Sequence, residues 1–375
     1  MRTSVFIHLD RFLRNFNAVK ARIGKEKRVC VPVKADGYGH GALQIAKISE
    51  EAGAFCLGVA TVDEGIELRK GGINIPILLM SQPDPQEIPE IFKASLTPFV
   101  SDSWFVNALN EQAVLLKTRL PVHLKIDTGM CRTGCRAEEA AALAGQITKC
   151  TFLELTGTAT HLAAADSTDL KDIACTRTQL TCFRDAVNAI RTAGIDPGIV
   201  HAANSGAVIL HPDSWFDMVR PGILLYGYKA AQENENSNFP YEPLTVEPVM
   251  ELKSTVVMIK KIKKGESVSY GRIWTAEEDT NIAILPAGYA DGLPRIVSGK
   301  WQAIIGGNAY PLVGRICMDQ CFVNLGINTT VRRWDEAEIF GSSHDASALA
   351  EAANTIPYEI TCNISKRVPR IYMNK

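Results

Sequence analysis

The sequence predicts an α/β fold: an N-terminal (β/α)8 TIM-type barrel followed by a mostly β C-terminal domain. Between residues 28 and 225, eight short apolar runs alternate with amphipathic stretches. After residue 228 the pattern changes to runs rich in β-branched residues, with few helical patterns between them. A chain of 375 residues also exceeds what one ordinary core supports, so two domains are expected.

The apolar runs of the first domain are expected to be parallel strands, because helical patterns separate them and parallel neighbours need such crossovers. Eight repeats of one strand and one helix favour a closed barrel over an open sheet. The runs cover residues 28–34, 55–60, 76–80, 96–100, 121–126, 153–160, 199–203 and 216–220. The clearest helical patterns cover residues 41–51, 62–70, 86–93, 137–147 and 170–193.

The C-terminal part is expected to be a second domain built mostly of strands. Its apolar runs cover residues 255–259, 281–285, 302–305, 320–323 and 336–340, with one short helix near residues 345–353. The polar stretch 232–241 is typical of a linker, so we divide the chain into residues 1–235 and 236–375. The first apolar run, Ser4–His8, is surplus to the eight barrel strands and is available to pair with the C-terminal domain.

Composition favours a soluble, cytoplasmic enzyme. A net charge of −1, with 46% hydrophobic and 22% charged residues, gives no basic surface for nucleic acid or an anionic membrane. No apolar run reaches the roughly 18 to 20 residues that span a bilayer. The early charges Asp10 and Arg11 leave no signal-peptide core. Ten cysteines without paired metal-ligand spacing suit a reducing compartment, and we expect no metal site.

The most informative segment is residues 33–41, Val-Lys-Ala-Asp-Gly-Tyr-Gly-His-Gly. An apolar run delivers Lys34 to its C-terminal end, and a Gly-rich loop follows at once. A lysine among apolar residues has its pKa lowered by desolvation, which makes the amine a nucleophile able to form a Schiff base. The segment therefore predicts an amine at a cleft where backbone can approach a ligand closely.

Polar residues gather at the ends of five predicted barrel strands, where TIM barrels carry their active sites. Besides Lys34, these segments are residues 125–132, 160–161, 201–206 and 220–223. Ser205 offers a hydroxyl, while Gly206 and Gly222 let backbone N–H groups approach an anion. Pro221 has no N–H, so Gly222 and Ile223 are the expected backbone donors. Such loops fit the phosphate cradle that pyridoxal phosphate requires.

Arg220 has two interpretations from the residues alone. It is either part of a structural ion pair or the partner of a pyridoxal ring nitrogen. An arginine has no acceptor and stays charged, so in the second case it would keep that nitrogen unprotonated. The carbanion would then be less delocalised, which restrains side reactions such as transamination.

With these residues assembled, the chain resembles the alanine racemase family over essentially its full length. The resemblance rests on residues 34–41, 127–132, 201–205, 220–227, 270–271, 285–292 and 314–320. It implies a pyridoxal-phosphate barrel with a C-terminal β domain, assembled as a head-to-tail homodimer. Each active site in that family draws residues from both subunits, and the family's D-alanine serves peptidoglycan synthesis in the bacterial cytoplasm.

The resemblance assigns the two bases that racemisation needs on opposite faces of Cα. Lys34 would hold the cofactor and act as one base, and Tyr270 of the partner chain would be the other. A tyrosine with an ordinary pKa near 10 needs help to act near neutrality. His161 would sit beside it and link it to Arg220, and cationic neighbours lower a phenol pKa. Without the resemblance, Tyr270 is a turn tyrosine at a domain surface.

Other roles follow from the same motifs. Arg132 would approach the cofactor's phenolic oxygen and the substrate, and Lys125 is the position that is carbamylated in many relatives. The expected cofactor residues beyond these are Tyr38, Asn204, Ser205, Gly222, Ile223 and Tyr358. The expected substrate residues are Met318, Cys317 and Asp319 of the partner subunit, and Tyr289 and Tyr358 would narrow the entrance. Cys131, where relatives often have glycine or a polar residue, puts the fine positioning of Arg132 in doubt.

Three alternatives to an alanine racemase differ in substrate or in reaction. A serine or broad-specificity racemase is one, although Tyr358 favours a small apolar side chain and an export signal is missing. A decarboxylase on the same fold would not need the second proton donor Tyr270. A non-catalytic pyridoxal-phosphate carrier would resemble the barrel alone, without the C-terminal domain.

Overall fold

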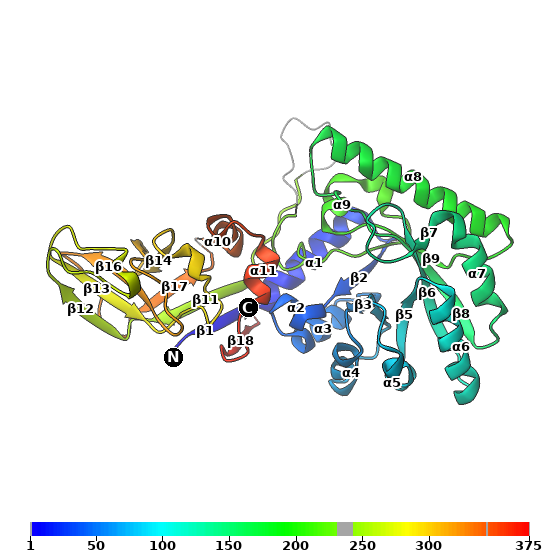
Figure 1. Cartoon of the computed structure of the whole chain (residues 1–375), viewed down its shortest axis with the longest axis horizontal. Helices are drawn as coiled ribbons and strands as arrows, with labels where there is room; N and C mark the ends of the chain where they lie inside the picture. The colour runs from blue at the N-terminus through cyan, green and yellow to red at the C-terminus, as the bar shows by residue number, and fades with distance from the viewer. Residues whose placement is uncertain (1, 231–242, 343, 375) are drawn as a thin grey trace.

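The computed structural model describes residues 2–230, 243–342 and 344–374 and arranges them in two lobes. Figure 1 shows a wide lobe with the parallel strands and most helices, and a narrow lobe built mainly of C-terminal strands. The predicted linker, residues 232–241, lies within the segment 231–242 and so outside the described residues. Across the described ranges, no helix combines the length and the apolar character needed to cross a membrane.

The wide lobe is the predicted barrel, with its strands adjacent in the order β10-β2-β3-β4-β5-β6-β8-β9 and all parallel. The ring nearly closes, because Asp217 N donates to Val200 O (3.0 Å) and Arg220 N donates to Ala203 O (2.8 Å). A two-residue strand, β7, pairs with β6. The strands are β2 (Arg28–Pro32), β3 (Cys56–Val59), β4 (Ile77–Leu79), β5 (Leu96–Val100), β6 (Leu120–Asp127), β7 (Cys135–Arg136), β8 (Leu153–Ala159), β9 (Ile199–His201) and β10 (Met218–Val219).

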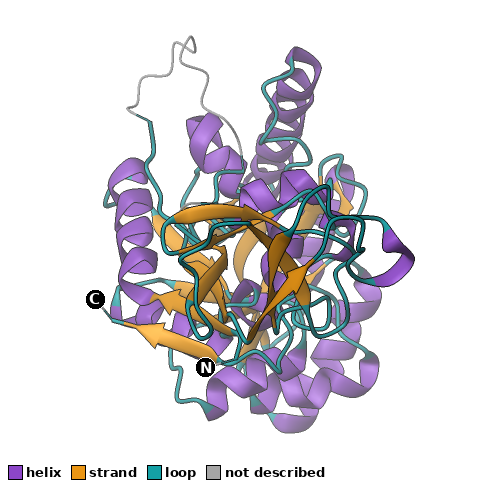
Figure 2. Ribbon diagram, turned by 90° about the vertical axis from the view of Figure 1, so that its left-hand side faces the viewer, coloured by secondary structure: helices purple, strands orange, loops and turns teal. Residues whose placement is uncertain are grey.

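Helices surround these strands, as Figure 2 shows. The longer helices have buried apolar residues. In α1, for example, Phe12, Phe16 and Val19 lie on the buried face at helical spacing. A capping box between Thr61 and Glu64 fixes the start of α4. The helices of this lobe are α1 (Leu9–Ile23), α2 (Lys34–Tyr38), α3 (Ala42–Glu51), α4 (Val62–Lys70), α5 (Ile88–Lys93), α6 (Ser103–Leu116), α7 (Ala140–Lys149), α8 (Leu170–Thr192) and α9 (Ser205–Leu210).

The narrow lobe contains two sheets, which confirms the mostly β second part. One sheet has the strand order β15-β14-β17-β11-β1-β18, and the other has β12-β13-β16. The first strand of the chain, β1, pairs antiparallel with β11 and parallel with β18. The strands are β1 (Ser4–His8), β11 (Met250–Thr255), β12 (Met258–Ile262), β13 (Thr280–Leu285), β14 (Gln302–Ile305), β15 (Asn308–Pro311), β16 (Cys321–Gly326), β17 (Glu336–Phe340) and β18 (Arg370–Met373).

Two expectations about this lobe were wrong. The run 255–259 is not one strand, because Val256 N donates to Asp335 O (2.9 Å) while Val257 N donates to Ile284 O (3.0 Å). The chain therefore changes sheets between these two residues. The single helix expected near 345–353 is α10 (Ala346–Ala353), but a second helix, α11 (Pro357–Cys362), follows it and contacts α2.

Candidate active site

Lys34 emerges at the C-terminal end of β2, in a turn whose backbone is unusual. Ala35, Asp36 and Gly37 have φ values of 53°, 53° and 61°, which L-residues rarely adopt. Neighbouring carboxylates hold this conformation: Glu64 accepts from Ala35 N (2.6 Å) and Asp36 accepts from Ala42 N (2.9 Å). Strain of this kind persists only where the surroundings fix it, and it is common at functional sites.

The strand-end residues of the barrel line a cavity of about 390 Å³. Its walls include four basic side chains, Lys34, Lys125, Arg132 and Arg220, and among the residues that the structure describes no carboxylate lines it. The further lining residues are Pro32, Tyr38, Met80, Ser81, Phe99, Thr133, His161, Asn204, Ser205, Gly222 and Tyr358. The cavity is therefore polar, positively charged and suited to an anionic ligand.

Burial and neighbouring cations lower the pKa of two lysines in this cavity. For Lys34, desolvation is the main cause and the charge of Arg132 adds to it, so the amine loses its proton more readily than an exposed lysine. Lys125 is buried, and desolvation together with Arg220 and Arg132 holds its pKa well below the usual range. Asp127 opposes this shift only in part.

Arg220 lines the cavity, and hydrogen-bond acceptors hold its guanidinium in place. Its Nη2 atom donates to the carbonyl oxygens of Thr160 (2.7 Å) and Ala202 (3.1 Å), and Nη1 contacts His201 Nδ1 at 2.7 Å. His161 Nδ1 lies 3.4 Å from Nη2. A guanidinium cannot accept, so both imidazoles accept at Nδ1 and carry their proton on Nε2. Burial, and then the charge of Arg220, lowers the pKa of both histidines and keeps them neutral.

One wall of the cavity is built from hydroxyls and close-packed glycine. A Cβ atom on Gly222 would lie 2.6 Å from the Tyr38 hydroxyl oxygen. Tyr38 cannot retreat easily, because its ring stacks on Tyr226 at 4.8 Å and Tyr226 itself donates to Pro32 O. Ile223, beside Gly222, is fully buried and does not line the cavity.

Tyr358 reaches the same wall from α11, the helix that the sequence analysis missed. Burial raises the pKa of Tyr358 to about 12, so this phenol stays protonated and able to donate. Its helix contacts α2, and a Cβ on Gly39 would lie 2.0 Å from Thr361 O, so the contact needs glycine. The C-terminal lobe thus contributes one residue to the barrel cavity of its own chain.

Arg132 stands on a turn that Asp127 organises by accepting from Gly129 N (2.9 Å) and Cys131 N (3.1 Å). Cys131 has a φ of 55°, in the left-handed region that favours glycine. Arg132 lines the cavity, yet it is exposed in the single chain. Its guanidinium is therefore accessible to a ligand as well as to solvent.

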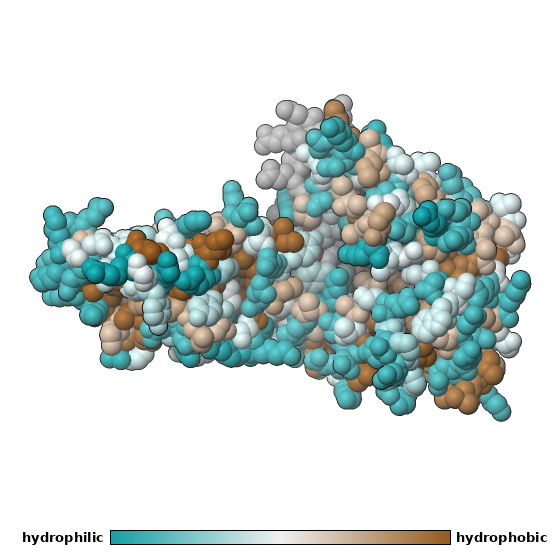
Figure 3. Space-filling view, viewed as in Figure 1, coloured by the Kyte–Doolittle hydropathy of each residue, from teal (hydrophilic) through white to brown (hydrophobic). Residues whose placement is uncertain are grey.

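The remaining predicted residues lie on the narrow lobe, in a hollow of about 830 Å³. Tyr270 begins a short 3-10 helix, η4 (Tyr270–Arg272), and is 72% exposed, while Met318 is 53% and Tyr289 43% exposed. The other lining residues are Ser269, Cys317, Asp319, Gln320 and Phe322. In Figure 3, apolar side chains interrupt the mostly hydrophilic surface of this lobe.

The structure thus gathers the predicted residues into two separate groups. None of the hollow's residues lines the barrel cavity, and strands β12, β13 and β16 lie at the far end of the molecule from the barrel (Figure 1). Sequence reasoning missed several residues of the cavity wall, among them Met80, Ser81 and Phe99. Their position at or just after predicted strand ends was the only signal that pointed to them.

Comparisons with known proteins agree on one family. Residues 7–230 match the family "Alanine racemase, N-terminal domain", and residues 249–372 match "Alanine racemase, C-terminal domain". The chain is 49% identical over 380 residues to the alanine racemase of Treponema denticola, covering 100% of this chain and 98% of that protein. It is 42% identical to the alanine racemase of Treponema pallidum, covering 98% of each chain.

Solved structures give the same result. An alanine racemase of Clostridium difficile superposes with a TM-score of 0.91 at 34% identity, covering 100% of this chain and 96% of that one. The alanine racemase of Streptomyces lavendulae gives a TM-score of 0.90 at 34% identity, covering 100% and 98%.

Proposed function

Because the chain belongs to the alanine racemase family, we propose that it interconverts L-alanine and D-alanine with pyridoxal 5'-phosphate. The observation that carries this proposal is the barrel cavity, where an amine of lowered pKa lies among three further basic side chains. The same proposal assigns cofactor binding to a domain of residues 1–235 and the second base to a domain of residues 236–375. The proposal also includes a role in supplying D-alanine for peptidoglycan in the bacterial cytoplasm. The bacterial origin of the relatives supports this role.

The cavity fits the proposed cofactor chemically. Its positive charge suits a phosphate dianion and a phenolic oxygen, and the lowered pKa of Lys34 leaves a nucleophilic amine for an aldehyde. Arg132 would meet the phenolic oxygen, and Arg220 would meet the ring nitrogen. The phosphate would be held by the wall that contains Tyr38, Asn204, Ser205, Gly222 and Tyr358, with the backbone N–H of Ile223 directly after Gly222 in the chain.

When bound, pyridoxal phosphate would acidify the Cα proton of an amino acid by withdrawing electron density from Cα. Arg220 would limit that withdrawal, since a donor-only guanidinium does not deliver a proton to the ring nitrogen. This restraint requires Arg220 to stay charged and fixed, which its carbonyl and imidazole acceptors support. Lys125 is a candidate for carbamylation. A carbamylated Lys125 would supply a negative charge beside Arg132 in place of an amine.

The proton transfers would be divided between two faces of Cα. Lys34 Nζ would remove or deliver the proton on one face, and the phenol of Tyr270 from a second chain would do so on the other. His161 accepts from Arg220 at Nδ1, which leaves its Nε2–H to donate to the tyrosine oxygen. The high exposure of Tyr270 in the single chain supports its use by a partner subunit.

The substrate would be held at its carboxylate by Arg132 and by Met318 through its backbone, with Cys317 and Asp319 alongside. Tyr358 and Tyr289 would narrow the approach and favour a methyl side chain. A homodimer with shared sites is therefore part of the proposal, because Met318 and Tyr289 line the hollow rather than the barrel cavity.

The proposal is tested by incubating the purified protein, loaded with pyridoxal phosphate, with L-alanine in deuterated water. We expect deuterium to enter Cα while optical rotation falls to zero. Unchanged rotation and unchanged Cα protons would contradict a racemase and favour a carrier. The same assay on L-serine and other small amino acids separates an alanine-specific enzyme from one of broad specificity.

A further inference from the structure

Two loops that lie side by side, residues 286–292 and 315–320, form a large part of the hollow on the narrow lobe. Tyr289 N donates to Cys317 O (3.1 Å) and Ala290 N donates to Met318 O (3.0 Å). A Cβ atom on Gly288 would lie 2.3 Å from both of these carbonyl oxygens, so the approach requires glycine. The position of Met318 therefore depends on how the first loop is held.

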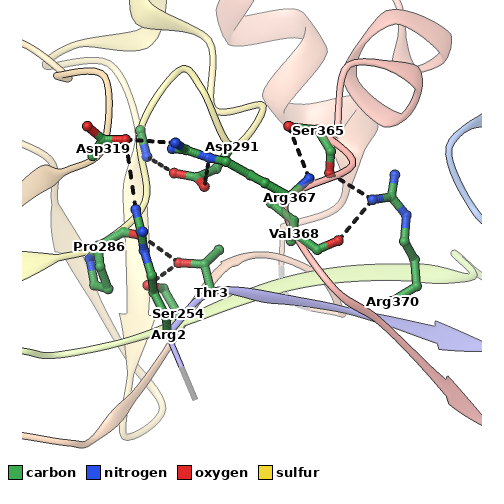
Figure 4. A network of polar contacts seen from close by, with 11 residues as sticks. Arg2, Thr3, Ser254, Pro286, Asp291, Asp319, Ser365, Arg367, Val368 and Arg370 are labelled. Atoms are coloured by element: carbon green, nitrogen blue, oxygen red, sulfur yellow. Dashed lines mark hydrogen bonds and ion pairs between the residues drawn. The ribbon is translucent and has the colours of Figure 1, made fainter.

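Arg367, from the segment between α11 and β18, joins these two loops through their carboxylates (Figure 4). Its Nε atom lies 2.8 Å from Asp291 Oδ1, and its Nη1 atom lies 2.8 Å from Asp319 Oδ1. The side chain of Asp291 is only 4% exposed, and its second oxygen accepts from Gly288 N at 2.9 Å. Charge-assisted pairs of this geometry are stronger than neutral hydrogen bonds.

Without Arg367, the two loops would lose their shared cation. Asp291 would keep its bond from Gly288 but would be a nearly buried carboxylate without an ion-pair partner, which is unfavourable. Asp319 would keep only Arg2, whose Nη2 atom lies 3.9 Å away. Arg2 also donates to Pro286 O at 3.3 Å, but within the described residues it forms no ion pair with Asp291.

Strand β18, which follows this segment, contacts the turn that carries Lys34. Arg370 Nε donates to Gly39 O (3.2 Å), and Arg370 Nη2 lies 4.0 Å from Asp36. Within one chain, Arg367 therefore lies three positions before a residue that contacts the Lys34 turn, while its own ion pairs go to the loops of the hollow. A role of Arg367 at the barrel site of its own chain and a role at the hollow predict opposite activities when different subunits are mixed.

We propose that Arg367 is a positioning residue that acts in trans: it orients the loops of Met318 and Asp319 for an active site whose lysine belongs to the other subunit. This inference rests on the proposed function, specifically on active sites shared between two chains. Arg367 touches neither substrate nor cofactor in it. Its effect passes through the two carboxylates and the backbone pairs between the loops.

The first test uses single variants of the cofactor-loaded dimer. We expect Arg367→Met to lower kcat/KM by about 10- to 100-fold, mainly through KM, because small misplacements of substrate-binding groups cost this much. Arg367→Lys, which can pair with one carboxylate but not bridge both in the same geometry, is expected to recover part of the loss. Lys366→Met, the exposed neighbour, is the matched control and should resemble wild type.

Cofactor absorbance and the melting temperature are measured on the same samples. Both should stay near wild type in Arg367→Lys, because the barrel cavity is untouched. An Arg367→Met protein with unchanged KM and kcat would overturn the proposal, as would a loss in kcat/KM that follows loss of bound cofactor. If Arg367→Met does not fold, Arg367→Lys carries the test.

The second test mixes subunits that carry different tags, so that only heterodimers are purified. In a heterodimer of Lys34→Ala with Arg367→Met, a trans role places both changes in one site and leaves the other intact, so about half of wild-type activity is expected. In a heterodimer of Tyr270→Phe with Arg367→Met, the two changes fall in different sites, and activity should not exceed that of the weakened Arg367 site. A role in cis predicts the reverse pattern and would overturn the proposal.

A heterodimer of Lys34→Ala with Tyr270→Phe is the reference, because it retains one unaltered site if sites are shared. Recovery in this reference with a reversed Arg367 pattern would overturn the Arg367 assignment alone. Absence of recovery in the reference, despite confirmed heterodimers, would overturn the shared site and therefore the proposed mechanism as well.

Discussion

The barrel cavity and the hollow on the narrow lobe contain the two halves of the predicted site, and they differ in how their residues are held. In the cavity, Arg220 and Lys125 are buried, and Arg220 is fixed by three acceptors at 2.7 to 3.1 Å. In the hollow, Tyr270 is 72% and Met318 53% exposed. The difference teaches that one chain by itself preorganises the proposed cofactor half but leaves Tyr270, the proposed second base, facing solvent.

Charge separates the two regions as well. The cavity collects four basic side chains, whereas carboxylates pair with Arg367 beside the hollow. A buried excess of positive charge is unfavourable unless an anion enters, so the cavity resembles a site built for its ligand. Beside the hollow, the carboxylates are paired with Arg367 of the same chain. The hollow instead resembles a surface that binds another protein surface. Substitutions in the two regions should therefore impair the protein in different ways.

The largest effect is expected from Lys34→Ala in the barrel half. Activity should fall by at least about 10⁴-fold, since this amine would serve both as attachment point and as one base. The absorbance that attached pyridoxal phosphate gives should also disappear, which a spectrum after dialysis measures. Lys47→Ala, an exposed lysine on α3, is the control. A Lys34→Ala protein that keeps this absorbance would contradict the assignment of the cofactor site.

Tyr270→Phe in the other half should lower activity nearly as much, but it should slow proton removal from only one of the two enantiomers. Removal of the Cα proton from L-alanine should slow by about 10²- to 10⁴-fold, the usual contribution of a general base. Exchange from D-alanine should persist, because Lys34 serves the opposite face, and cofactor absorbance should be unchanged. Deuterium incorporation into each enantiomer measures both rates, with Tyr310→Phe as the control. Equal slowing for the two enantiomers would count against two bases.

The barrel was predictable because its strands are buried on both faces and therefore form continuous apolar runs. The run 96–100 coincides with β5 (Leu96–Val100), and the helix expected at 62–70 coincides with α4 (Val62–Lys70). The narrow lobe was less predictable. Strand β15 (Asn308–Pro311) is largely exposed and has no apolar run, and the six-residue helix α11 is too short to show a helical period.

The site shows the same contrast. Lys34 stands out in sequence because a motif of nine consecutive residues surrounds it. The ion pair between Asp291 and Arg367 joins residues 76 positions apart, and no local pattern predicts it. The acceptors of Arg220 include backbone carbonyls, which every residue possesses, so only the folded barrel shows which ones converge.

The smallest effect, and the one that tests the charge contrast directly, is expected from Lys125→Met in the apo protein in carbonate-free buffer. Burial, Arg220 and Arg132 lower the pKa of Lys125 well below its ordinary value of 10.5, with Asp127 opposing them. Between the lowered pKa and 10.5, the unfolded chain binds one more proton at this lysine than the folded chain. This difference makes the folded wild type gain up to about 1.4 kcal/mol of stability per pH unit as pH rises.

Replacing Lys125 with Met removes this slope while keeping a side chain of similar length in the core. The variant should therefore exceed wild type in free energy of unfolding at pH 7.5, and the difference should shrink as pH approaches 10.5. Denaturant titrations at several pH values measure it, and Lys366→Met, at an exposed position, should show no such trend. A difference that stays constant with pH would mean that folding does not lower the pKa of Lys125, and the cavity would then lose its electrostatic distinction from the hollow.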